Sequence, residues 1–126
     1  MRARMMTALC LAALAACDNP QPSKPQRSIA VRSEAQTALH KLTDMNLKIA
    51  LRRAIYDSGS ACMTVTKAGY VQEYGNLSMW TASCASGRSF AVFVGPDGSA
   101  QVRDCREMAP LKLPACTIKK DAKAAA

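Results

Sequence analysis

Two short turns that each end in glycine set the spacing of the second half of this sequence and constrain its fold most strongly. Ala85-Ser86-Gly87 and Gly95-Pro96-Asp97-Gly98 each separate runs in which apolar residues alternate with other residues. Pro96 favours a type I turn, and the final glycine suits the left-handed residue that follows such a turn in a short hairpin loop. The sequence therefore predicts antiparallel strands over residues 77–84, 89–94 and 99–105.

Loops of three residues also determine which residues lie opposite one another on neighbouring strands. The expected cross-strand pairs are Trp80–Val92, Ala82–Phe90, Val92–Val102 and Val94–Ala100. This register places the apolar members of the pairs on one face of the sheet. A slip of one residue would turn that set toward water, so the pattern supports the register.

A helix is predicted before the strands. Ser33 and Gln36 fit a capping box at its start, and Gly59 fits the left-handed residue after its last turn. Two apolar stripes follow this segment, so the helix is either buried on two sides or broken near Thr43-Asp44; we favour one helix over residues 33–58. One stripe comprises Ala35, Ala38, Leu42, Met45 and Ile49, and the other Leu47, Leu51 and Ile55.

The fold class that follows is α+β. One N-terminal helix is expected to cover one face of a small antiparallel β-meander of three to four strands, and two disulfides are expected to cross-link the domain. A short β-branched run over residues 61–66 supplies a first strand, and residues 67–76 are expected to form a loop.

The second face of the predicted sheet carries more apolar residues than a solvated face should. Either the segment 108–117 folds over this face, or the face is a patch that binds a partner. Together with the predicted 67–76 loop, which carries two tyrosines, it gives the candidate partner-binding residues. These are Tyr70, Tyr74, Met79, Phe93 and Arg103.

Four cysteines lie within the predicted domain. Cys62 comes opposite Cys84 if their strands pair, whereas Cys84 and Cys105 lie on strands separated by a third, about 9–10 Å apart and too far to bridge. We therefore expect the disulfides Cys62–Cys84 and Cys105–Cys116. Each would add about 3 kcal/mol of stability to a domain whose core is small.

The N-terminus reads as an export signal. Arg2 and Arg4 precede an apolar run that is too short to cross a bilayer, and small residues follow. The end of this segment, Leu14-Ala15-Ala16-Cys17, resembles the lipobox of bacterial lipoproteins.

That resemblance implies that Cys17 is lipid-modified and becomes the first residue of the mature chain. It implies a periplasm-facing protein held on the membrane by its acyl chains, where disulfides persist. Asp18 resembles the aspartate that follows the cysteine in lipoproteins retained in the inner membrane, so the resemblance favours the inner membrane over the outer. The expected organisation is a signal at 1–16, a lipidated and proline-rich tether at 17–28, the domain at 29–117 and a flexible tail at 118–126.

Residues suited to catalysis are sparse. His40, the only histidine, is expected on the exposed surface of the helix, and Glu73, Asp97, Asp104 and Glu107 show no pattern that marks a carboxylate pair. The cysteine spacing does not fit a zinc site, and no phosphate-binding or zinc-protease motif is present. We expect no enzyme, cofactor or metal.

The net charge of +8 is spread over the chain and its flanks without the clustered stripe that nucleic acid requires. The sequence thus favours a lipid-anchored, non-enzymatic binding or scaffolding module with an envelope protein as its possible partner. Two alternatives remain open, a periplasmic inhibitor of a cell-wall hydrolase such as lysozyme, and a small uncharacterised enzyme.

Overall fold

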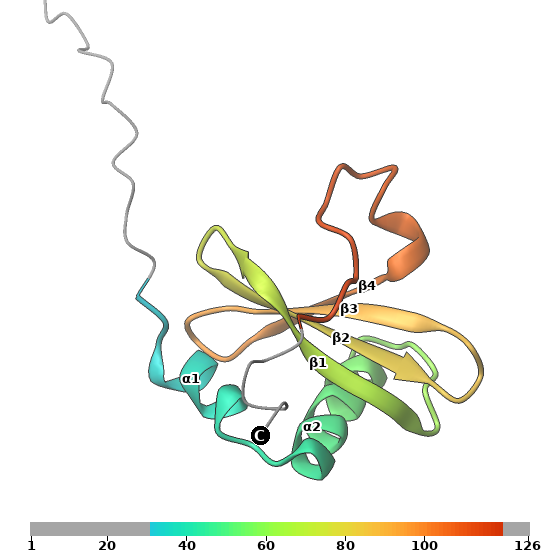
Figure 1. Cartoon of the computed structure of the whole chain (residues 1–126), viewed down its shortest axis with the longest axis horizontal. Helices are drawn as coiled ribbons and strands as arrows, with labels where there is room; N and C mark the ends of the chain where they lie inside the picture. Colours follow the sequence, from blue (N-terminus) through green and yellow to red (C-terminus); the bar gives the residue numbers. More distant parts are fainter. Residues whose placement is uncertain (1–30, 120–126) are drawn as a thin grey trace, which may run out of the picture.

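A computed structural model describes residues 31–119 as two helices followed by a four-stranded antiparallel sheet. The elements are α1 (Glu34–His40), α2 (Asp44–Asp57), β1 (Val65–Tyr74), β2 (Leu77–Cys84), β3 (Ser89–Val94), β4 (Ala100–Asp104) and the 3-10 turn η1 (Cys105–Glu107). Figure 1 shows the helices on one side of the sheet. The expected α+β fold is confirmed.

The strands form a meander in the order β1-β2-β3-β4, and all four predicted cross-strand pairs are present. The two glycine turns share one hydrogen-bond pattern. Gly87 N donates to Cys84 O and Gly98 N to Gly95 O, both at 3.0 Å. Gly87 and Gly98 have φ of +89° and +83°, the left-handed conformation that the turns require.

The predicted single helix is wrong, because the chain breaks between α1 and α2. The Thr43 side chain accepts a hydrogen bond from Asn46 N at 3.3 Å and starts α2 as its N-cap. After this break α2 directs Leu47, Leu51 and Ile55 into the core. The other stripe of the helical segment does not continue into the core: Met45 and Ile49 are exposed.

Replacing Thr43 with alanine should lower the free energy of unfolding by about 1 kcal/mol, because the first turn of α2 loses its cap. Thr43→Ser keeps the hydroxyl and should retain most of the wild-type stability. Urea denaturation of both variants measures the difference. Equal losses in the two variants would contradict a capping role.

Gln36 joins α1 to the sheet. Its side chain and that of Ser33 form the predicted capping box, while Gln36 Nε2 donates to Asn76 O at 2.7 Å and to Val94 O at 2.9 Å. The side chain is fully buried with its donors and acceptor paired. α1 is therefore fixed beside the β1–β2 turn and the end of β3.

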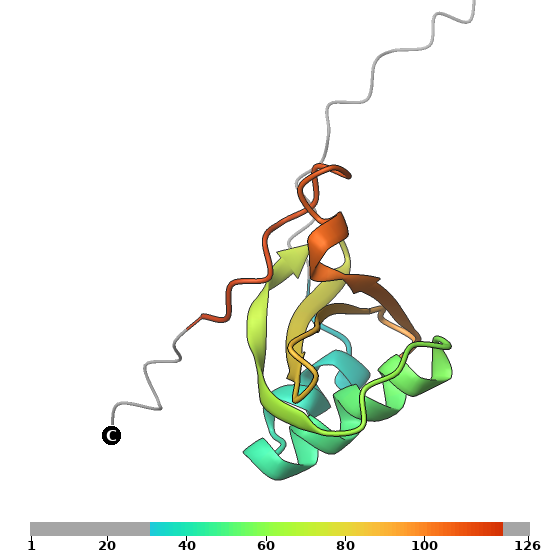
Figure 2. The same ribbon diagram turned by 90° about the vertical axis from the view of Figure 1, so that its right-hand side faces the viewer.

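The sheet has a core on each face. The first, between the sheet and α2, includes Leu51, Ile55, Trp80, Phe90 and Val92. The second is made by Val71, Met79, Ala91, Phe93 and Met108, with Leu77, Leu113 and Cys116 packed against it. Figure 2 shows the C-terminal segment on the side of the sheet opposite the helices.

Both expected disulfides are present. Cys62–Cys84 ties the segment after α2 to the end of β2, and Cys105–Cys116 closes the C-terminal segment over the second core. Cys62 precedes the first strand instead of lying in it, because β1 begins at Val65, and the predicted 67–76 loop is β-strand as far as Tyr74. The predicted strand over residues 61–66 is thus placed too early.

Some predictions fall outside the described residues. The signal at 1–16, Cys17, the tether at 17–28 and residues 120–126 belong to this group. The predicted tail begins too early, however. Lys119 N donates to Tyr70 O at 2.8 Å, and Ile118 lies so close to Gly69 that a side chain on that glycine would collide with it. Residues 118 and 119 therefore pack on β1.

Candidate binding site

Two of the five predicted partner-binding residues are buried. Met79 and Phe93 lie in the second core beneath Met108, so the apolar character of this face reflects packing and the prediction is wrong for both. Tyr74 is exposed and sets its ring edge-on to Phe93, with centroids 5.9 Å apart. Arg103 is exposed on β4. These residues do not form a continuous exposed surface.

Tyr70 is half-buried and supports the fold. Its ring lies 4.6 Å from that of His40 and 5.3 Å from that of Trp80. Burial raises the pKa of its hydroxyl, which donates a hydrogen bond to Glu73 at 3.1 Å. His40 also lies 4.7 Å from Trp80, so the predicted exposed histidine packs between two aromatic rings.

Glu73 is the centre of a polar cluster where the N-terminal segment meets the sheet. Its carboxylate accepts from Arg32 Nε at 2.6 Å, from the Tyr70 hydroxyl, and from Ser78 Oγ at 2.8 and 3.0 Å. Burial raises the pKa of this carboxyl, but the hydrogen bonds from Arg32, Ser78 and Tyr70 outweigh burial and leave it below its ordinary value. This cluster fixes the position at which the chain enters the domain.

A lowered pKa in the folded state means that Glu73 stabilises the fold above the ordinary pKa of a glutamate, near 4.5. The contribution is lost as the pH falls through the folded-state pKa. Glu73→Gln should therefore be less stable than wild type at pH 7, and this difference in stability should disappear on acidification below pH 4.5. Thermal unfolding of both proteins across this pH range measures the difference. A difference in stability that does not change with pH would contradict a stabilising role for the Glu73 carboxylate.

An exposed apolar surface with a concave shape lies between α2 and the segment that precedes β1. A groove of about 390 Å³ is lined there by Met45, Lys48, Ile49, Arg52, Met63, Thr64 and Val65. Its three largest apolar residues expose a large fraction of their surface to solvent: 71% for Met45, 46% for Ile49 and 83% for Met63. Single exposed apolar residues are ordinary, whereas three around one groove mark a candidate binding site. We call it the α2 groove.

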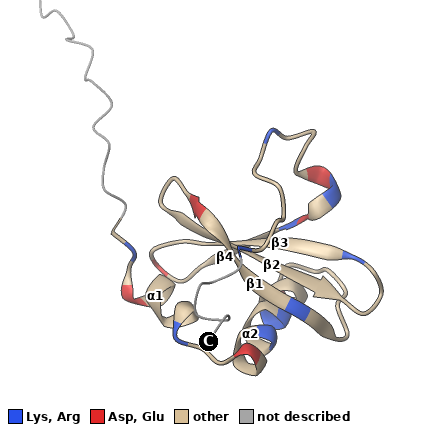
Figure 3. Ribbon diagram, in the orientation of Figure 1, with Lys and Arg blue, Asp and Glu red and all other residues tan. Residues whose placement is uncertain are grey.

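Two basic residues of α2, Lys48 and Arg52, line the α2 groove. Figure 3 shows in blue that α2 carries basic residues. Lys48 Nζ lies 2.7 Å from the carboxylate of Asp44, one turn earlier. Arg52 Nε donates to Cys62 O at 3.3 Å, which holds its guanidinium beside the disulfide-linked segment that presents Met63. The groove therefore combines an apolar floor with a positively charged border.

The sequence contained one signal for the α2 groove. Met45 and Ile49 form an i,i+4 pair in a helical segment with two apolar stripes, and only one stripe can face a single sheet once the helix breaks at Thr43. The single helix that we favour from the sequence would instead be buried on two sides. Met63 could have been found by its position directly after the disulfide-bonded Cys62, because the bridge limits how its backbone can move.

Of the four carboxylates considered as catalytic acids, Glu107 is exposed and the other three accept hydrogen bonds from named partners. Glu73 is bound by Arg32, Tyr70 and Ser78, Asp97 accepts from Ser99 in a turn, and Asp104 is paired with two arginines. Within residues 31–119, no three His, Cys, Asp or Glu side chains are grouped so that they could hold a metal ion. Nor does this part of the chain include a helix with the length and apolar character needed to cross a membrane.

Comparison with known proteins found no relative: no protein-family model, curated protein or solved structure matches this chain.

Proposed function

We propose that this chain is a lipid-anchored protein of the bacterial envelope and that its domain is a non-enzymatic binding module. The lipobox-like sequence ending at Cys17 supports the anchor. The α2 groove is the observation that carries the binding role, because it exposes three large apolar side chains on a scaffold held by two disulfides.

The partner we propose is an envelope protein that inserts an apolar side chain into the groove and places acidic residues beside it. A volume of about 390 Å³ has room for such an anchoring side chain. Methionines adapt their shape to an incoming group, which suits Met45 and Met63 to this contact. Lys48 and Arg52 on the border favour carboxylates on the partner.

Site-specific photo-cross-linking in intact cells tests this proposal with the full chain. A photoreactive residue at Met63 should give discrete adducts, whereas the same residue at Leu111, an exposed apolar position on the C-terminal segment, should give none. Reversing the charge of the border with Lys48→Glu and Arg52→Glu should remove the Met63 adducts.

Arg53→Glu is the matched control, because Arg53 lies on the same helix but lines a different pocket, beside Gly98 and Ala100. It changes the net charge as either border substitution does and should leave the adducts in place. Identical adducts from Met63 and Leu111, or adducts that survive reversal of Lys48 and Arg52, would contradict the proposal.

A further inference from the structure

A second pocket lies at the end of the sheet farthest from Arg32. Arg32 bonds to Glu73 near the end of β1, and the chain then returns along β2 to the opposite end, where β3 begins and β4 ends. This is the end that carries the β2–β3 turn in Figure 1. The pocket there has a volume of about 360 Å³ and is lined by Gly87, Arg88, Ser89, Asp104, Cys105 and Arg106.

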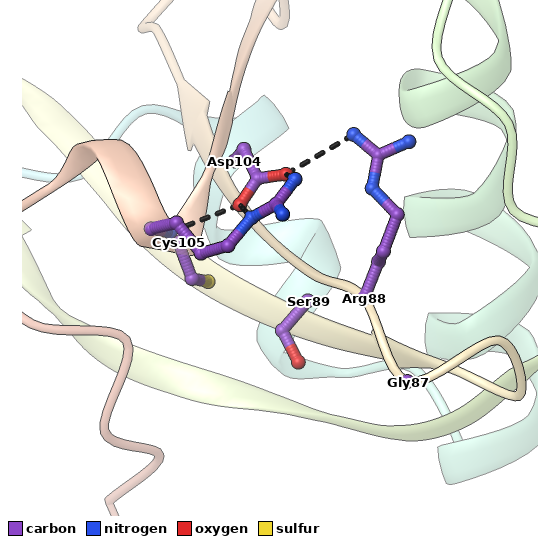
Figure 4. A pocket seen from close by; sticks show the side chains of 6 residues that line it. Gly87, Arg88, Ser89, Asp104 and Cys105 are labelled. Carbon is purple, nitrogen blue, oxygen red and sulfur yellow. Dashed lines mark hydrogen bonds and ion pairs between the residues drawn. The ribbon is translucent and has the colours of Figure 1, made fainter.

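Asp104 orients two guanidinium groups around this pocket. Its Oδ2 accepts from Arg88 Nη2 at 3.0 Å and from Arg106 Nη2 at 2.8 Å, and its Oδ1 accepts from Arg106 Nε at 3.0 Å. Figure 4 shows Arg88 and Asp104 reaching toward each other across the pocket. The carboxylate also accepts from the backbone N of Arg106 at 2.9 Å, and its side chain is only 11% exposed.

The backbone and a neighbouring ring hold this arrangement in place. Arg88 lies over the ring of Phe90, 4.8 Å from its centroid, and Phe90 is buried in the first core. Cys105, between Asp104 and Arg106, is fixed by its disulfide to Cys116. The two guanidinium groups are thus positioned before any ligand arrives, which lowers the entropic cost of binding.

Most of the hydrogen-bond donors of these two groups remain available. A guanidinium carries five N–H donors, and Arg88 uses one and Arg106 two of them on Asp104. Asp104 is also the sole carboxylate among the residues that line the pocket, so it balances one of the two positive charges there. Glu107 interacts with Arg106 from outside the pocket and leaves Arg88 as the less compensated cation.

We propose that this pocket binds an oxyanion, a carboxylate or a phosphate group, between Arg88 and Arg106. Planar guanidinium groups match the geometry of both ligands, and charge-assisted hydrogen bonds of this kind are among the stronger ones in proteins. The oxyanion accepts from N–H donors of the two arginines that Asp104 leaves unused, so Asp104 stays in place as the group that orients both arginines. The site does not depend on the lipid anchor or on the α2 groove.

The test follows the arginine Nε–H signals of the mature, full-length chain in detergent micelles by ¹⁵N NMR. Inorganic phosphate and acetate are each titrated against sodium chloride at constant ionic strength. The signals of Arg88 and Arg106 should shift along a saturating curve in the millimolar range, and chloride alone should not produce this curve. The phosphate and acetate arms show which oxyanion the pocket prefers.

Arg88→Gln should weaken the binding detected at Arg106 by about tenfold, because one of the two guanidinium groups is gone. Arg103→Gln is the matched control: it removes the same charge from β4 at a residue outside the pocket lining and should leave the curve unchanged. Unchanged backbone amide signals elsewhere verify the fold of each variant. Chemical-shift changes that rise linearly with the anion concentration without saturating, or that are equally large at Arg103, would overturn the proposal.

Discussion

Replacing Phe93 with alanine should lower the free energy of unfolding by about 3–5 kcal/mol, the usual cost of removing a buried phenylalanine side chain. The ring is buried in the second core with Met79, Ala91 and Met108, so its removal would leave a cavity there. Urea denaturation with both disulfides intact measures this loss.

Tyr74→Ala serves as the comparison for Phe93→Ala. Tyr74 contacts the Phe93 ring but is exposed, so its truncation should cost on the order of 1 kcal/mol or less. Similar small effects for the two substitutions would mean that the C-terminal segment does not cover this face, and would restore Phe93 as a candidate for partner binding.

Replacing Cys62 and Cys84 together with alanine should cost about 3 kcal/mol, because the bridge restricts the unfolded chain over a separation of 22 residues. The bridge also positions Met63 and the carbonyl that accepts from Arg52, so the double variant should lose the Met63 adducts even where it remains folded. Urea denaturation of this variant and of wild type, both without a reductant, measures the contribution of this bridge.

Cys105→Ala with Cys116→Ala provides the matched control for that substitution. It removes a bridge of similar energetic value but leaves the α2 groove intact, so adducts at Met63 should persist under conditions where the variant is folded. If the Cys62–Cys84 variant were as stable as wild type, the bridge would have no role in holding the domain together.

Local signals were sufficient to predict the strand register and the disulfides. The two glycine turns fix the pairing of β2, β3 and β4 through geometry that spans only a few residues. The export that we expect from the N-terminal sequence would make disulfides the favoured state of the cysteines. The capping box at Ser33 and Gln36 is equally local. No local pattern indicates that Gln36 Nε2 donates to the carbonyls of Asn76 and Val94, which lie far along the chain.

The errors arise where tertiary packing decides between local alternatives. Apolar periodicity showed two stripes in the helical segment, and the Thr43 cap determines which stripe faces the sheet and which becomes the α2 groove. In β1, the register shifts after Val65 and again after Tyr70, so alternation is interrupted and the strand resembles a loop in sequence. The burial of Met79 and Phe93 depends on a segment that packs from beyond β4.

The Asp104 pocket could not be predicted for a related reason. Arg88 and Arg106 are distant in sequence and meet only because β3 and β4 pair, with Phe90 opposite Asp104. As single residues they look like ordinary surface cations. Their shared bonds to one carboxylate become visible only after the register is known.

The intact mass of the protein extracted from membranes tests the central claim most directly, with thiol alkylation before and after reduction. We expect a chain that begins at Cys17, carries added acyl mass and exposes the thiols of Cys62, Cys84, Cys105 and Cys116 only after reduction. A chain without acyl mass would contradict the lipid anchor, and thiols that react without reduction would contradict the disulfide-stapled domain.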